Sequence, residues 1–317
     1  MTRNPTLSPP LLHELIFFGA VALTSVRAIF GMWTRSTIAW LLLALLAGAC
    51  IWWNARQASD PLNQRRHYRF LAITLGVYLS LSLGIGATYY EQLASTSLAW
   101  DQRLHQVDQL VFGDTLFRLI RLKMLTWPAL ATHLCDELFS LAYITLLPLE
   151  VAALWALSRD PAALKQFSVG LFTVYGLGFL GYTLVPAMGP TAGMGIEMFG
   201  AAPVETLSIT HLQYTIVRYL SIKYDVFPSL HAAIPLYMLL FAIRYATLRT
   251  LSFATLTLLL IMLSISAVYL GYHYFLDTVV GALLGAIGLC AIEAQSFLES
   301  RFVTDMKPAN ESTHRLQ

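Results

Sequence analysis

The sequence predicts an all-α fold, a polytopic membrane helix bundle with about eight transmembrane helices. Of the 317 residues, 57% are hydrophobic and 12% are charged, whereas a soluble domain usually carries about 25% charged residues. A helix needs about 20 mostly apolar residues to cross a bilayer. Eight segments approximately meet this requirement: 12–33, 38–54, 70–93, 128–157, 166–187, 229–248, 251–271 and 275–298.

These segments and their connections divide the chain into three parts. The first two segments and the polar linker after them form an N-terminal transmembrane hairpin and cytoplasmic linker at 1–69. The main membrane domain spans 70–298, and 299–317 is a polar tail. Within the membrane domain, the apolar and basic stretch 94–127 predicts either a helix in the membrane interface or a surface helix that bridges two spans. The glycine- and proline-rich stretch 188–227 predicts a loop.

The distribution of lysine and arginine predicts the orientation. With both termini in the cytoplasm, twelve of the 20 Lys and Arg residues lie on the cytoplasmic side, seven lie outside, and Arg27 lies in the first span. Cytoplasmic loops carry an excess of Lys and Arg. We therefore expect an integral multi-pass protein of the plasma or inner membrane with cytoplasmic termini. The sequence contains no basic run that would suggest a nucleic-acid partner.

Two short motifs carry the candidate chemistry. They are Phe227-Pro228-Ser229-Leu230-His231 and His273-Tyr274-Phe275-Leu276-Asp277, and their histidines are 42 residues apart. Two spans and a tight turn take about 40 residues. Both histidines should therefore lie at one membrane face, which the orientation makes the extracytoplasmic face. Asp277 follows His273 by four residues, so on a helix it lies on the same side one turn later.

The surroundings of His231 favour an anion-binding site. Pro228 can set the start of a helix, Ser229 can cap it, and His231 then lies in the first turn. The free N–H groups of a helix N-terminus suit an anion such as phosphate. Either motif alone could be structural, because Pro-Ser-Leu-His fits an ordinary capped helix and the spacing of a histidine and an acid four residues later recurs at His133. The two motifs at one face indicate a functional site.

The residue types predict phosphoryl transfer through histidine. Asp277, one turn from His273, can hold one ring N–H, set the tautomer and stabilise developing positive charge. The other ring nitrogen is then free to attack phosphorus, which would form a phosphohistidine. His231 can protonate the leaving oxygen. We therefore expect His273 to be the nucleophile, Asp277 to orient it and His231 to act as the acid and base.

Further polar residues are candidates for substrate binding. They are Ser229, Lys223, Arg218, Asp136, Glu137 and Tyr143. The first three lie in or just before the His231 motif and could bind a phosphate group. The last three lie in the fourth span and could line a head-group pocket, or else form a buried polar network between helices. No cluster of three or four metal ligands is readable, so we expect neither a metal nor another cofactor.

At these motifs the sequence resembles the type 2 phosphatidic acid phosphatase superfamily, and more closely its branch with fungal inositol phosphorylceramide synthase. The superfamily pattern is Lys-x6-Arg-Pro, then Pro-Ser-Gly-His, then Ser-Arg-x5-His-x3-Asp. The second element matches at 228–231, with Leu230 in place of glycine. The third matches at 266–277, with Ala267 in place of arginine. The first is absent, and 185–190 occupies its place.

The resemblance covers roughly residues 98–298 and implies a six-helix lipid-phosphatase-like core, to which the N-terminal hairpin is added. It also implies a metal-free phosphohistidine mechanism that acts on a lipid phosphate substrate in the membrane. The missing basic residues favour a phosphodiester, which carries one charge, over a monoester with nearly two. This favours a lipid phosphotransferase. The alternatives are a phosphatase for phosphatidic acid or isoprenyl diphosphate with the same fold, and an inactive transporter or scaffold.

Overall fold

The computed structural model describes residues 91–157, 160–195, 208–220, 224–245 and 250–305, and every regular element in these ranges is a helix. The predicted all-α class is confirmed for this part of the chain. The N-terminal hairpin and linker at 1–69, nearly all of the third apolar segment and most of the polar tail lie outside the described residues.

The other five predicted apolar segments are helical. Segment 128–157 forms two helices, α6 (Ala129–Ile144) and α7 (Leu146–Leu157), which meet at a bend of 43°. The other four correspond to α8 (Pro161–Leu184), α11 (Leu230–Tyr245), α12 (Thr250–Tyr269) and α13 (Phe275–Asp305). The start of α8 is clear in the sequence, because Pro161 occupies its first turn and the Asp160 side chain accepts hydrogen bonds from two backbone nitrogens of that turn.

Two of the described helices have the length and composition of a membrane span. These are the stretches Ala162–Tyr182 of α8 and Phe275–Arg301 of α13, and the bent α6–α7 pair can form a third span. Helices α11 and α12 are apolar but shorter. The described part of the chain is therefore a helical membrane bundle, while the count of eight spans stays a prediction.

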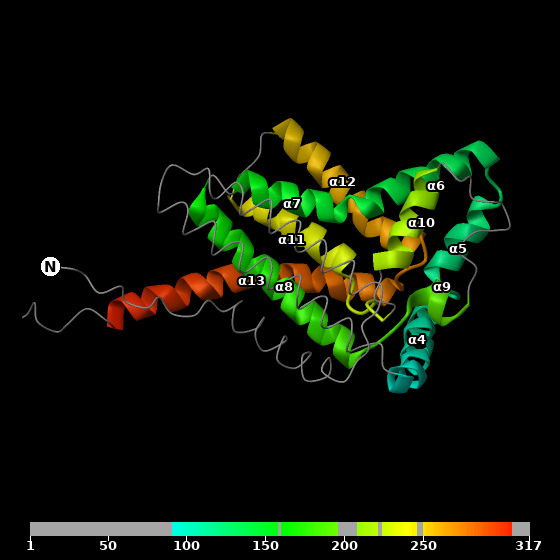
Figure 1. The fold of residues 1–317 in the computed structure, drawn as a ribbon, viewed down its shortest axis with the longest axis horizontal. Helices are drawn as coiled ribbons and strands as arrows, with labels where there is room; N and C mark the ends of the chain where they lie inside the picture. The colour runs from blue at the N-terminus through cyan, green and yellow to red at the C-terminus, as the bar shows by residue number, and fades with distance from the viewer. Residues whose placement is uncertain (1–90, 158–159, 196–207, 221–223, 246–249, 306–317) are drawn as a thin grey trace, which may run out of the picture.

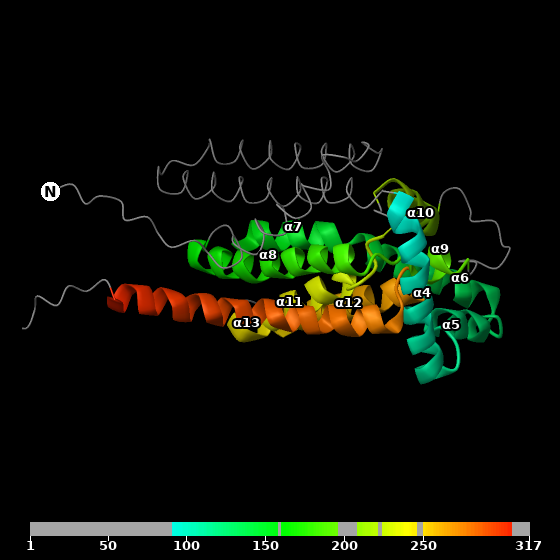
Figure 2. The ribbon, with the colours of Figure 1, turned by 90° about the horizontal axis from the view of Figure 1, so that it is seen from below.

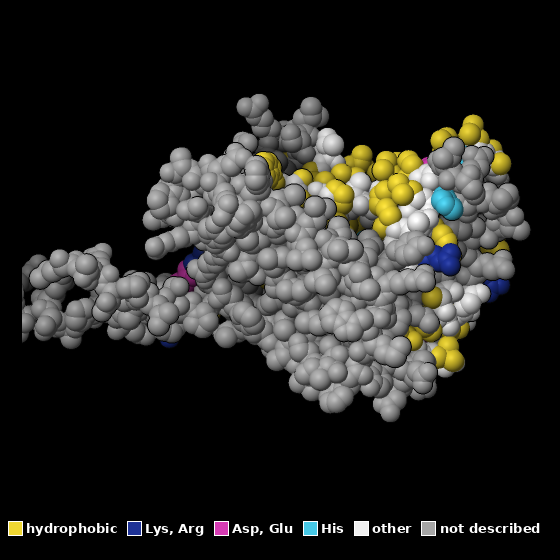
Figure 3. All heavy atoms as spheres, viewed as in Figure 1, with side chains coloured by type: hydrophobic (Ala, Val, Ile, Leu, Met, Phe, Trp, Pro, Cys, Tyr) yellow, Lys and Arg dark blue, Asp and Glu magenta, His cyan; other side chains and the backbone are white. Residues whose placement is uncertain are grey.

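The long helices lie side by side in two layers. Figure 2 shows α7 and α8 above α11, α12 and α13, with α4 (Glu91–Phe112) crossing one end of the bundle. In the space-filling view, apolar side chains occupy the middle of the described surface and charged ones lie towards its two ends (Figure 3). Exposed apolar residues such as Trp155, Leu258 and Leu283 fit a surface that faces lipid.

Small residues bring α11 and α13 into backbone contact. A Cβ atom at Gly281 of α13 would lie 2.2 Å from the carbonyl oxygen of Ser229, and one at Gly285 would lie 2.4 Å from that of Ala233. Side chains at these positions would push the helices apart, so the four-residue glycine spacing permits the close approach. This approach joins the N-terminal ends of the two helices that begin at the histidine motifs.

The shorter helices gather at the end of the bundle where α4 crosses (Figure 1). They are α5 (Leu116–Met124), α9 (Gly189–Gly193) and α10 (Ile209–Leu220). The helix expected within 94–127 is present as α4 and α5. The prediction of a loop at 188–227 was wrong in part, because α9 and α10 form there. Helix α10 receives its N-terminal cap from Glu137 of α6, a contact between distant parts of the chain that local composition cannot reveal.

Candidate active site

His231 lies in the first turn of α11, as predicted. The backbone nitrogens of Ala232 and Ala233 donate to the carbonyl oxygen of Ser229, at 3.2 and 3.0 Å, which closes this first turn. The backbone nitrogen of Ser229 donates to the carbonyl oxygen of Asp277 at 3.0 Å. The start of α11 is thereby tied directly to the first turn of α13.

His273 lies in the tight connection between α12 and α13. The backbone nitrogens of Tyr272 and His273 both donate to the carbonyl oxygen of Ala267 at 3.1 Å. The chain turns at Gly271, which has a φ of +76°, a backbone conformation that favours glycine. A side chain at this position would also clash with the Phe117 ring. The connection is therefore short and packed on both sides, which restricts the position of the His273 ring.

Asp277 contacts His273 from the first turn of α13. One of its carboxylate oxygens, Oδ2, accepts a hydrogen bond from the backbone nitrogen of Tyr274 at 2.8 Å and lies 3.5 Å from Nδ1 of His273. The side chains of His273 and Asp277 are buried, with exposed fractions of 4% and 0%. Asp277 can therefore both shape the turn and orient the imidazole.

The two histidine rings face one another across a short gap. Their centroids are 5.9 Å apart, and the ring planes are inclined by 51°. The ring of Tyr143 stacks on His231 at 4.1 Å, and Tyr272 lies 5.0 Å from Tyr143. A phosphorus atom between the histidines could be reached by a nitrogen of each ring, which is the arrangement that an attack and a proton transfer at one centre require.

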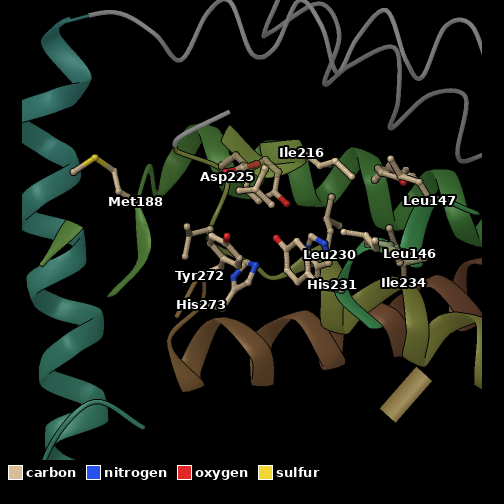
Figure 4. A pocket seen from close by; sticks show the side chains of 16 residues that line it. Leu146, Leu147, Met188, Ile216, Asp225, Leu230, His231, Ile234, Tyr272 and His273 are labelled. Atoms are coloured by element: carbon tan, nitrogen blue, oxygen red, sulfur yellow. The ribbon is translucent and has the colours of Figure 1, made fainter. Parts of the chain in front are cut away.

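A cavity of about 180 Å³ opens beside the histidines. Figure 4 shows Asp225, Tyr272 and His273 at one end of it, His231 in the middle, and Leu146, Leu147 and Ile234 at the other end. The cavity is thus polar at the candidate catalytic groups and apolar towards the bundle interior. Its full lining is Tyr143, Ile144, Leu146, Leu147, Tyr175, Tyr182, Met188, Ile216, Val217, Asp225, Val226, Leu230, His231, Ile234, Tyr272 and His273.

Two buried aspartates of α4 hold the segments around His273 and were not among the sequence-predicted site residues. Asp101 accepts hydrogen bonds from the backbone nitrogens of Met188 and Gly189 and from the Tyr274 hydroxyl, at 2.9 to 3.2 Å. Asp108 accepts from the backbone nitrogen of Phe275 at 3.1 Å. Burial raises the pKa of both carboxyl groups, although these donors act in the opposite direction. Their separation of seven residues, two helical turns, was the available signal.

Two of the six candidate substrate-binding residues, Ser229 and Tyr143, lie at the site. Ser229 is buried beside Asp277, and Tyr143 lines the cavity. Arg218 is exposed near the end of α10 and does not line the cavity. Lys223 lies outside the described residues.

The two acids predicted for the head-group pocket do not line the cavity either. Asp136 forms an ion pair with Arg121 at 2.6 Å and accepts from the Tyr269 hydroxyl at 2.8 Å. Glu137 accepts from the backbone nitrogen of Ile209 at 2.7 Å and from the Thr210 hydroxyl at 2.9 Å. These contacts correspond to the alternative interpretation, a polar network that connects α6 to α5, α12 and α10.

Helix α10 in turn supports the cavity wall. Nε2 of Gln213 donates to the hydroxyl oxygen of Tyr272 at 3.0 Å, and Ile216 and Val217 line the cavity. Among the described residues, no group of three or more His, Cys, Asp or Glu side chains is placed to hold a metal ion.

Comparison with known proteins identifies one family. A family model described as the PAP2 superfamily matches residues 102–291, a range that includes both histidine motifs and most of the described helices. No curated protein and no solved structure matches the chain.

Proposed function

We propose that this chain, which belongs to the PAP2 superfamily, is a membrane phosphotransferase that moves a phosphoryl head group between lipids. The superfamily supports a phosphoryl-transfer enzyme of the phosphatase or phosphotransferase type. The closer proposal is an activity similar to that of inositol phosphorylceramide synthase, with a phosphodiester lipid as donor and a lipid hydroxyl as acceptor. The observation that carries it is the pair His231 and His273, at 5.9 Å between ring centroids, beside an amphipathic cavity.

The first half of the reaction forms a covalent intermediate. Nδ1 of His273 faces Asp277 at 3.5 Å, which leaves Nε2 as the nucleophile. Its attack forms a nitrogen–phosphorus bond, and the bond between phosphorus and the oxygen of the leaving lipid alcohol breaks. His231, on the opposite side, donates a proton to that oxygen. Asp277 stabilises the positive charge that develops on the His273 ring.

The second half regenerates the enzyme. An acceptor hydroxyl takes the place of the departed alcohol, gives its proton to His231 and attacks phosphorus, and the nitrogen–phosphorus bond breaks. Transfer competes with hydrolysis, because water could attack in the same position. An acceptor held in the correct orientation has an advantage worth about 7 kcal/mol or more, so a binding site for the acceptor is sufficient to favour transfer.

The cavity supports a lipid as the substrate. Its apolar end is lined by Leu146, Leu147 and Ile234, which lie within about one helical turn of the starts of α7 and α11. This end extends away from the histidines into the bundle. Burying an acyl segment there is favourable by about 0.8 kcal/mol for each CH₂ group. A lipid whose phosphoryl group lies at His231 and His273 would then direct its apolar chain towards the membrane interior.

The decisive experiment separates transfer from hydrolysis. Purified protein in lipid nanodiscs is given phosphatidylinositol with a labelled phosphorus, with and without an added lipid that bears a free hydroxyl. We expect a new labelled phosphodiester lipid in the presence of the acceptor, and none with the His273→Ala variant. Phosphatidic acid and isoprenyl diphosphate are tested in parallel. Release of inorganic phosphate from these monoesters, without cleavage of the diester, would identify a phosphatase instead.

A further inference from the structure

The two histidines of the site are held by different kinds of contact. His273 has a carboxylate beside it, because Oδ2 of Asp277 lies 3.5 Å from its Nδ1. No described residue forms a hydrogen bond or ion pair with the ring nitrogens of His231. The His231 ring instead lies flat against the ring of Tyr143, with 4.1 Å between the centroids and 14° between the planes. The contact that fixes His231 therefore acts on the face of its ring.

The Tyr143 ring is itself held from two sides. Tyr143 lies one residue before the end of α6, where the chain bends by 43° into α7. The backbone nitrogen and the hydroxyl of Thr145 both donate to the carbonyl oxygen of Ala142, at 3.2 and 2.6 Å, which closes this last turn. The Tyr143 ring also lies 5.0 Å from the ring of Tyr272, whose hydroxyl oxygen accepts from Nε2 of Gln213 at 3.0 Å. Helices α6 and α10 together thus determine where the Tyr143 ring lies.

The orientation of the His231 ring matters because the site is narrow. The centroids of the His231 and His273 rings are 5.9 Å apart, and Figure 4 shows both rings beside the cavity. Proton transfer requires the two heavy atoms to lie about 2.6 to 3.2 Å apart. A rotation of the His231 ring would move its nitrogen away from the leaving oxygen, and the stacked Tyr143 ring blocks such a rotation on one face.

A contact on the ring face suits a group that changes its protonation state twice in each reaction. In the proposed cycle, His231 gives a proton to the leaving oxygen and later takes one from the acceptor hydroxyl. A fixed hydrogen-bond acceptor would hold a proton on one of its nitrogens, whereas stacking restrains the ring plane and leaves both nitrogens to the substrates. The face of an aromatic ring also attracts a cation within about 6 Å of its centroid, so Tyr143 favours the protonated form that acts as the acid.

We propose that Tyr143 is a positioning residue for general-acid catalysis, which acts through His231 as Asp277 acts through His273. This role rests on the proposed function, in which His231 is the acid. It belongs to the aromatic ring of Tyr143 and is separate from the head-group contact expected of its hydroxyl. The ring should therefore matter most when the leaving group must be protonated.

The test compares two leaving groups on otherwise equal phosphodiesters. One substrate carries two alkyl alcohols, and in the other p-nitrophenol replaces one of them. An alkyl alcohol leaves readily only when it is protonated, whereas p-nitrophenolate leaves without a proton, so only the first substrate needs a general acid. The release of each leaving group in a single turnover is measured with the protein in nanodiscs. The ratio of the two rates is the readout, because a partly unfolded protein loses both rates equally.

Tyr143→Leu removes the aromatic face and keeps an apolar side chain. It should slow the release of the alkyl alcohol by about a hundredfold and that of p-nitrophenolate by less than about tenfold. Tyr143→Phe retains the ring and should keep the ratio of the unmodified protein. Phe139→Leu is the matched control, since it removes a ring of the same helix that stacks on Tyr269 at 4.2 Å, outside the cavity lining. It should leave the ratio unchanged. If Tyr143→Leu does not fold, Tyr143→Met takes its place.

A second comparison tests whether Tyr143 acts through His231. His231→Gln removes the acid and should show the same selective loss of alcohol release. In that background Tyr143→Leu should change the ratio no further, because two residues that act as one unit are not additive. A further selective loss would mean that Tyr143 acts on the leaving group by itself.

The outcomes separate this role from the proposed function. An equal loss with both substrates in Tyr143→Leu, or an equal effect of Tyr143→Phe and Tyr143→Leu, would overturn the inference even if the protein transfers a phosphoryl group between lipids. A protein that cleaves only monoesters would contradict the proposed function, and the comparison is then made with an alkyl phosphate and p-nitrophenyl phosphate. A selective loss with the alkyl phosphate in Tyr143→Leu would still support the role of Tyr143, and an equal loss with both would overturn it.

Discussion

The backbone nitrogen of Phe275 donates a hydrogen bond to Oδ1 of Asp108 at 3.1 Å, which joins α4 to the first turn of α13. The other carboxylate oxygen of Asp108 accepts from the backbone nitrogen of Leu116. Asp108 is 1% exposed, so water cannot replace either contact easily. Because Phe275 lies between His273 and Asp277, Asp108 is a positioning residue for the candidate catalytic pair.

Asp108→Ala should lower kcat about tenfold or more and leave KM nearly unchanged. The substitution removes the acceptor for Phe275, and loss of such a cap costs about 1 kcal/mol of stability. Asp108→Asn retains one acceptor oxygen and should recover part of the rate. Steady-state kinetics well below the unfolding temperature provides the measurement. A variant with lower thermal stability but normal kcat would show that Asp108 is structural only.

Gly281→Ala should greatly reduce activity. Its new methyl group would lie 2.2 Å from the carbonyl oxygen of Ser229, and because this neighbour is backbone, α11 and α13 must separate. The separation would widen the gap between His231 and His273. Val279→Ile adds one methylene group on an exposed side of the same helix and should leave turnover unaffected. Normal activity in Gly281→Ala would mean that the distance between the histidines is not critical.

Asp277→Asn should preserve the fold and reduce the rate of phosphoenzyme formation by about a hundredfold or more. The asparagine oxygen can still accept from the backbone nitrogen of Tyr274, but it no longer stabilises a positively charged His273 ring or enforces its tautomer. Rapid-quench labelling of the acid-labile phosphohistidine measures this step directly. His273→Ala should give no label at all. Retention of the label in His273→Ala would assign the nucleophile to another residue.

The motif residues could be predicted from the sequence because their positions follow from local spacing. A proline and a serine before His231 predict that a helix starts there, although the buried Ser229 hydroxyl makes no hydrogen bond to the described residues and so does not cap the helix. A separation of two spans returns the chain to the same face at His273. Asp277 follows by one turn. None of these inferences requires knowledge of how distant helices pack, and the structure brings the three side chains together.

The supporting residues could not be predicted in the same way. Asp101 and Asp108 reach the site only because α4 crosses the end of the bundle, and Glu137 caps α10 from a helix about 70 residues earlier in the chain. Asp225 was not among the predicted site residues, although it lines the cavity. The seven-residue spacing of Asp101 and Asp108 indicates that they share one face of a helix, but a single sequence does not show which distant segment that face contacts.

Asp101 should make the stability of the protein sensitive to pH. Burial raises the pKa of its carboxyl group above the ordinary value of 3.8, so the folded state binds a proton more readily than the unfolded state. The contribution of Asp101 to the free energy of unfolding is therefore largest below pH 3.8 and falls as the pH rises through the folded pKa.

Asp101→Asn cannot ionise, and its thermal stability relative to the unmodified protein should improve as the pH increases across this window. Melting temperatures in detergent at a series of pH values provide the comparison. The Asp114→Asn variant controls for the change in net charge at the same end of the bundle. If the melting temperatures of Asp101→Asn and of the unmodified protein change with pH in parallel, an effect of burial on the pKa of Asp101 is contradicted.

Asp136→Asn and Glu137→Gln should reduce stability without changing the ratio of transfer to hydrolysis. Asp136 pairs with Arg121 at a site where both side chains are 16% exposed, and removing one charge of a partly buried pair is costly. Glu137 caps α10, and glutamine keeps only a neutral acceptor there. Tyr143→Ala on the same helix removes the ring stacked on His231 and should lower turnover. The melting temperature and the product ratio are measured for all three variants. A changed product ratio in Asp136→Asn or Glu137→Gln would show that the acid takes part in binding the acceptor, although it does not line the cavity.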